Sequence, residues 1–176
     1  MILRSIRVAP LLPAVFAVAC GGGEEGEGPK TFTDPAGYSL EVPAGWNLSD
    51  RTAGNGLIRA DVTRGEGMGI QARLLPLSPS GFDAAASRLL RDYMRDMSGH
   101  WGGNVAETGR VTPEVGERAL TVRLRASRDD GSFWYLQESF VSAGDMLVVL
   151  QGGCPWKDRV RAREAFDAMV ESVSFP

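Results

Sequence analysis

Histidine and cysteine are scarce in this chain of 176 residues. His100 is the single histidine, and Cys20 and Cys154 are the only two cysteines. One histidine cannot build a multi-histidine metal site, and the chain has neither a Cys-x-x-Cys pair nor the acidic spacing of a calcium-binding loop. We therefore expect no bound metal ion.

Long apolar runs, positive net charge and phosphate-binding loops are also missing. Beyond residue 19 no apolar run approaches the roughly 20 residues of a membrane-spanning helix. The formal net charge of −3 argues against a nucleic-acid surface. The glycine clusters at 65–69 and 99–103 do not lead from a strand into a helix, as a phosphate-binding loop does. We expect no cofactor and no nucleic-acid partner.

The N-terminal segment has the pattern of an export signal. Arg4 and Arg7 precede an uncharged run at 8–19, which is too short to span a membrane. Cys20 follows directly after small residues, and this arrangement resembles the lipobox of bacterial lipoproteins, whose cysteine thiol receives a diacylglycerol. The resemblance predicts an acylated, palmitate-type anchor on Cys20. The alternative is ordinary secretory cleavage after 17–19, which leaves Cys20 free to pair with Cys154.

The pattern also predicts where the protein resides and how it is divided. Segment 1–19 is the signal peptide, and 20–30 is the lipidated cysteine followed by a polar, glycine-rich tether. Residues 31–176 form a single domain. Gly21, directly after the cysteine, favours the outer membrane of a bacterial cell envelope, with the domain facing the periplasm.

Hydrophobic periodicity predicts an α+β fold. One helix begins near Phe82 and ends near Ser98, and a second extends from about Pro155 to about Glu171, each with one apolar stripe. Both faces are apolar in the runs that begin at Phe133 and Met146, which predicts central strands. The pattern gives a largely antiparallel, twisted sheet sandwiched by two main helices. The expected strands are 31–33, 38–42, 57–62, 68–75, 105–111, 117–126, 133–141 and 146–150.

Both ends of the domain resemble the PsbP-like fold, and in particular its DcrB-type bacterial lipoproteins. The resemblance is carried by a helix leading into Val170-x-Ser172-Val-x-Phe175, and at the start of the domain by Phe32-x-Asp34-Pro-x-Gly37-Tyr-Ser-Leu-x-Val42-Pro-x-Gly45-Trp46. Members of this fold act mostly as adaptors, chaperones or assembly factors. The resemblance therefore implies a binding role and supplies no catalytic residue.

Cys154 is the one candidate nucleophile. The stretch Gly152-Gly153-Cys154-Pro155 stands at a predicted helix start, where the helix dipole would lower the pKa of the thiol, and His100 would be its base. The alternative is a cysteine at the end of a buried strand that packs as a small hydrophobic residue. We favour the second interpretation and expect no enzyme activity.

Arginines on several predicted strands suggest a partner surface. If the strands are neighbours and face the same way, their side chains form a basic face on an acidic protein. Such a face would bind an acidic envelope protein or an anionic envelope polymer. The alternative is that the arginines are scattered, solvated and paired with Asp61 and Glu138. The candidate residues are Arg59, Arg73, Arg123 and Arg125, with Thr121 beside them.

The sequence thus predicts a membrane-anchored envelope lipoprotein whose domain binds a protein or an envelope polymer without catalysis. Two alternatives remain at this point. One is a carrier of a hydrophobic small molecule held between the sheet and a helix. The other is a thiol enzyme that uses Cys154.

Overall fold

A computed structural model describes residues 28–53, 58–65, 67–77, 81–101 and 103–176. The predicted signal peptide, Cys20 and most of the tether lie outside the described residues. The elements are β1 Lys30–Asp34, β2 Tyr38–Val42, β3 Asn47–Asp50, β4 Ile58–Thr63, β5 Gly69–Pro76, α1 Phe82–Trp101, β6 Val105–Val111, β7 Arg118–Ser127, β8 Phe133–Ala143, β9 Met146–Pro155, a 3-10 turn Trp156–Asp158 and α2 Arg159–Glu171.

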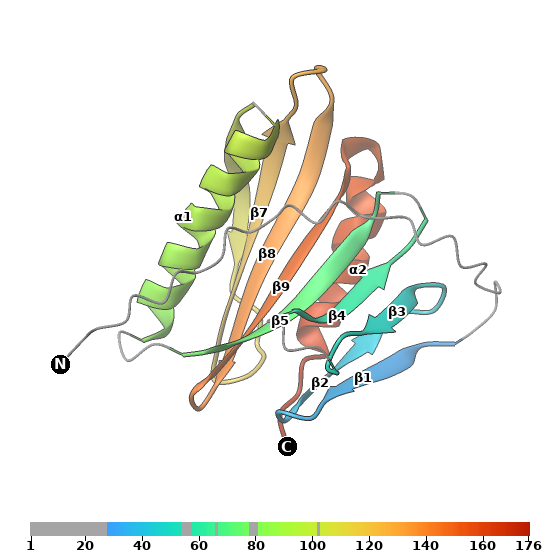
Figure 1. The fold of residues 1–176 in the computed structure, drawn as a ribbon, viewed down its shortest axis with the longest axis vertical. Helices are drawn as coiled ribbons and strands as arrows, with labels where there is room; N and C mark the ends of the chain where they lie inside the picture. The colour runs from blue at the N-terminus through green and yellow to red at the C-terminus, as the bar shows by residue number, and fades with distance from the viewer. Residues whose placement is uncertain (1–27, 54–57, 66, 78–80, 102) are drawn as a thin grey trace.

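Seven of these strands form one antiparallel sheet in the order β3-β4-β5-β9-β8-β7-β6. Strands β1 and β2 form a separate two-stranded antiparallel sheet. The twisted sheet has α1 on one face and α2 on the other (Figure 1). The predicted α+β sandwich is confirmed.

The two faces of the sheet carry two separate apolar clusters. The α1 cluster joins Phe82, Leu90 and Tyr93 to strand residues such as Phe140. The α2 cluster is larger, because it also takes in the β1–β2 hairpin, and Phe166 of α2 is fully buried in it. A backbone bridge between Ser39 and Ser174 ties this hairpin to the end of the chain.

Strands β8 and β9 lie in the middle of the sheet, as their two-faced apolar pattern predicts. Along β8, Leu136 and Phe140 pack in the α1 cluster, whereas Tyr135 and Val141 pack in the α2 cluster. Because successive side chains of a strand point to opposite faces, the cluster in which a residue packs identifies the face of its neighbours.

One strand and the junction between β9 and α2 differ most from the sequence prediction. Strand β3 was not expected, because only Leu48 of its four residues is partly buried and alternation is too weak to see. Strand β9 continues through Gly152 and Gly153 to Pro155, where cross-strand pairing with β8 overrides the low strand propensity of glycine. Helix α2 consequently begins at Arg159, after the 3-10 turn.

Candidate functional site

The arginines predicted to form a basic face are separated by the fold. Arg59 of β4 donates to the carboxylate of Asp34 at 2.7 Å, and the Asp34 side chain is fully buried. The Asp34 carboxylate also accepts from the backbone N–H of Ala36, so this ion pair fixes the β1–β2 turn. Hydrogen bonding to Asp34 raises the pKa of Arg59. Arg59 is thus a structural residue that links the hairpin to the sheet.

Arg73 of β5 lies on the face that carries α1. Its neighbour Ala72 packs in the α2 cluster, so Arg73 points to the opposite side. Only 6% of Arg73 is exposed, and it donates to Gln151 at 3.1 Å. Gln151 in turn donates to Glu138 at 2.9 Å. Burial of Glu138, which is 1% exposed, raises the pKa of its carboxyl to about 8.

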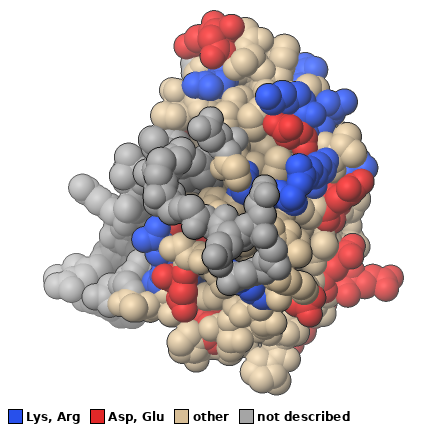
Figure 2. All heavy atoms as spheres, turned by 90° about the vertical axis from the view of Figure 1, so that its right-hand side faces the viewer, with Lys and Arg blue, Asp and Glu red and all other residues tan. Residues whose placement is uncertain are grey.

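Arg123 and Arg125 of β7 face α2. Arg123 donates to Asp167 of α2 at 2.8 Å. Arg125 is exposed, and its guanidinium lies 5.0 Å from the ring centre of Phe133. The four arginines therefore do not form one basic face: Arg59, Arg73 and Arg123 are hydrogen-bonded to other side chains. In addition, Arg73 faces the opposite side from Arg123. On the face shown in Figure 2, basic and acidic side chains are interspersed.

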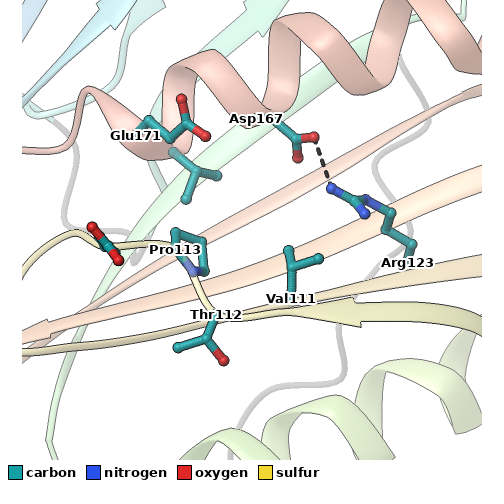
Figure 3. Close-up of a pocket in the computed structure, with 8 residues that line it drawn as sticks. Val111, Thr112, Pro113, Arg123, Asp167 and Glu171 are labelled. Carbon is teal, nitrogen blue, oxygen red and sulfur yellow. Dashed lines mark hydrogen bonds and ion pairs between the residues drawn. The ribbon is translucent and has the colours of Figure 1, made fainter.

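Arg123 and Asp167 meet in a groove between α2 and the connection from β6 to β7 (Figure 3). The groove encloses about 570 Å³. In Figure 3, Asp167 and Arg123 point toward one another from the helix and the sheet, and Glu171 lies one turn further along the helix. The lining residues are Val111, Thr112, Pro113, Glu114, Arg123, Asp167, Val170 and Glu171.

A buried polar network supports the floor of this groove. The second carboxylate oxygen of Asp167 accepts from Gln137 of β8 at 3.0 Å, and Gln137 accepts from the hydroxyl of Tyr135. Gln137 also donates to Ser139, which accepts from Thr121 at 2.9 Å. Apolar side chains at these buried strand positions would pack against α2 but could form no hydrogen bond with Asp167. The network instead fixes the orientation of Asp167.

The sequence alone did not identify Asp167, Glu114 or Glu171 as site residues. Helix α2 presents Asp167 and Glu171 one turn apart, so both reach the same side of the helix. A usable signal did exist in β8, where Gln137 and Ser139 occupy positions that a central strand normally fills with apolar residues. Buried polar residues of this kind need partners, and the partner here is α2.

The structure does not bring Cys154 and His100 together. Cys154 is fully buried in the α2 cluster, whereas His100 is exposed near the end of α1 on the other face of the sheet. Cys154 also lies within β9, so it is not at a helix start. Burial, reinforced by Asp158, raises the pKa of the thiol to about 12. The described geometry therefore gives Cys154 neither a base nor an activated thiolate.

In the part of the chain that the structure describes, no group of three or more His, Cys, Asp or Glu side chains is placed to hold a metal ion. In the same residues, neither α1 nor α2 is long and apolar enough to cross a membrane.

The architecture and the site define a PsbP-like α+β sandwich with a groove beside its second helix. The solution structure of the cyanobacterial PsbP protein CyanoP from Synechocystis sp. PCC 6803 superimposes with a TM-score of 0.67, covering 92% of this chain and 99% of CyanoP at 13% identity. The Ran-binding protein Mog1p of Saccharomyces cerevisiae gives a TM-score of 0.55, covering 85% of this chain and 96% of Mog1p at 12% identity.

A Bacteroides thetaiotaomicron protein also shares the fold, with a TM-score of 0.55 at 10% identity, over 85% of this chain and 49% of that protein. No protein-family model and no curated protein sequence matches the chain. The structural likenesses therefore establish the PsbP-like fold. At sequence identities this low they establish nothing beyond the fold.

Proposed function

We propose that this protein is a DcrB-type bacterial lipoprotein whose PsbP-like domain binds a partner in the cell envelope and catalyses no reaction. Cys20 carries the lipid, and the polar stretch that follows it serves as a tether to β1, which begins at Lys30. The basic start, the short apolar run and the cysteine after small residues support this assignment.

The groove beside α2 is the observation that carries the binding role. It combines an open, charged surface with a floor held by Arg123, Asp167 and the buried network behind them. Fixed polar groups next to apolar walls are typical of a recognition site. Mog1p, described as a Ran-binding protein, is a precedent for protein binding on this fold. The charged lining favours a polar partner over the hydrophobic small molecule of the carrier hypothesis.

Lipidation would hold this domain at the membrane for as long as the acyl chains remain. Each buried methylene contributes about 0.8 kcal/mol, and two or three acyl chains together resist dissociation. The proposed location is the periplasmic side of the outer membrane, for which Gly21 after the cysteine is the sequence support.

Mass spectrometry of the mature N-terminus tests the anchor. We expect the mature chain to begin at Cys20 with added diacylglycerol and acyl mass, and a Cys20→Ala variant to leave the membrane fraction. An unmodified Cys20 in the mature wild-type protein would show that the anchor is absent.

Site-specific photo-crosslinking in intact cells tests the groove. A photoreactive amino acid replaces Val111, which is 39% exposed on the groove wall. Exposed Ser87 on α1 is the matched control. We expect a crosslinked adduct that depends on position 111. Equal crosslinking from both positions, or none from position 111, would contradict binding at the groove.

A further inference from the structure

Two carboxylates in the groove have no partner within the described part of the chain. Glu114 follows β6, and Glu171 is the last residue of α2. Both are exposed and line the groove, yet neither takes part in an ion pair or a side-chain hydrogen bond with a described residue. Because Asp167 already neutralises Arg123, the groove as a whole is acidic. A positively charged ligand would complement this acidic groove.

The other residues that line the groove indicate which kind of molecule would bear the positive charge. Val111 and Pro113 give the groove apolar walls, and Val111 is among the most exposed large apolar side chains of the described residues. A bare metal ion or a small hydrophilic amine gains nothing from these walls. A polypeptide segment with alternating apolar and basic side chains uses both kinds of surface.

Arg123 supplies a third element of recognition. Its Nη2 donates to Asp167, but its Nε has no hydrogen-bond partner, although the atom is buried. A guanidinium has five N–H donors and no acceptor. The guanidinium donors that Asp167 leaves unused are available to a main-chain carbonyl, which a peptide offers at every residue. The groove therefore presents a donor for the backbone, apolar walls and two free carboxylates.

We propose that this groove binds an extended protein segment in which a lysine or arginine is flanked by apolar residues. This inference rests on the proposed binding function and specifies the partner of the same site. The cationic side chain lies between Glu114 and Glu171, and its apolar neighbours contact Val111 and Pro113. The partner is thus opposite in sign to the acidic partner that the arginine pattern in the sequence suggests.

The buried network gives this groove its specificity. Gln137 holds one oxygen of Asp167 and Arg123 holds the other, so the floor is set before a ligand arrives. A site whose groups are fixed in advance loses less conformational freedom on binding. The network also keeps the Asp167 carboxylate engaged, so the partner's cation meets Glu114 and Glu171.

Binding of defined peptides to the mature protein in nonionic detergent tests the inference. The probes are acetylated and amidated Ala-Val-Lys-Val-Ala and its Gln and Glu counterparts at the central position. Binding is followed by the backbone amide shifts of Val111 and Val170. We expect the Lys peptide to bind at least about tenfold more tightly than the Glu peptide, and added salt to weaken it.

Charge-removing variants locate the effect. The double variant Glu114→Gln, Glu171→Gln should lower the affinity for the Lys peptide about five- to tenfold and leave the affinity for the Gln peptide unchanged. The matched control, Glu117→Gln with Glu164→Gln, removes two exposed carboxylates that do not line the groove and should change neither. Unfolding curves of both double variants establish that they are folded.

Three outcomes would overturn the inference: equal affinity for the Lys and Glu peptides, an equal loss in both double variants, or spermidine binding as tightly as the Lys peptide. The last result would identify a site for small cations. These outcomes differ from failure of the proposed function, which the in-cell crosslink from position 111 reports independently of the partner's charge.

Discussion

Gly152 of β9 lies directly against the ring of Phe166 in α2. A Cβ atom added to Gly152 would be 2.7 Å from Cε2 of that ring, which is closer than real Cβ contacts allow. Phe166 is fully buried, so the ring has no room to retreat. The absence of a side chain at position 152 is therefore what lets α2 approach the sheet.

Gly152→Ala should lower the free energy of unfolding by about 1–3 kcal/mol, because overpacking forces either the ring or the helix to move. Urea denaturation measures the change. Gly109→Ala is the matched control: it also lies in a strand, neither glycine has a positive φ, and an added Cβ at Gly109 meets nothing within 4 Å. Equal effects at the two positions would contradict the packing argument.

The ion pair between Asp34 and Arg59 should contribute far more to the free energy of unfolding than an exposed ion pair does. Asp34→Ala removes a fully buried carboxylate and leaves Arg59, whose side chain is 18% exposed, without its partner. We expect a loss of about 3 kcal/mol by urea denaturation. Glu107→Ala breaks the exposed pair with Arg110 on β6 and should cost less than about 1 kcal/mol. Similar losses in both variants would show that burial of the pair is unimportant.

The thiol of Cys154 should be unreactive in the native protein. Burial raises its pKa to about 12, and the side chain is fully buried, so neither thiolate nor access is available at pH 8. Labelling with iodoacetamide in a Cys20→Ser background should be complete in denaturant and negligible without it. Rapid native labelling at pH 8 would refute this assignment and revive the thiol-enzyme hypothesis.

Glu138 should make stability depend on pH. Its folded-state pKa is raised to about 8 from 4.5, so the folded protein holds the proton more tightly than the unfolded chain. This contribution is fully present below about pH 4.5 and is lost as the pH rises toward 8. Glu138→Gln should therefore flatten the stability profile across this window by a few kcal/mol.

Denaturation curves at pH 5 and pH 8 measure the Glu138 effect. Exposed Glu41→Gln serves as the control and should keep the wild-type slope. An unchanged slope in Glu138→Gln would mean that Glu138 titrates normally in the folded protein.

Most of the elements were predictable because their signals are local. Strand β2 was predicted with its observed bounds, since Tyr38, Leu40 and Val42 alternate with polar residues. Helix α1 followed from its apolar stripe, although it continues to Trp101. Strand β3 and the end of β9 were missed, because they are specified by pairing with β4 and β8 rather than by their own alternation.

The candidate site was predictable only in part. Arg123 was identified from the sequence, but its partner Asp167 is 44 residues away and is brought to it by the packing of α2. The polar pattern of a strand shows that an arginine lies on the opposite side from its apolar neighbours in the strand. It does not show which face that arginine takes or which carboxylate meets it.

The sequence by itself determined the alternation of strands and helices and the central position of β8 and β9, because each depends on neighbouring residues. Tertiary structure decided the order of strands, the burial of Cys154 and the division of the arginines between Asp34, Gln151 and Asp167. These depend on contacts between distant segments, whose geometry is fixed only when the two helices pack on opposite faces of the sheet.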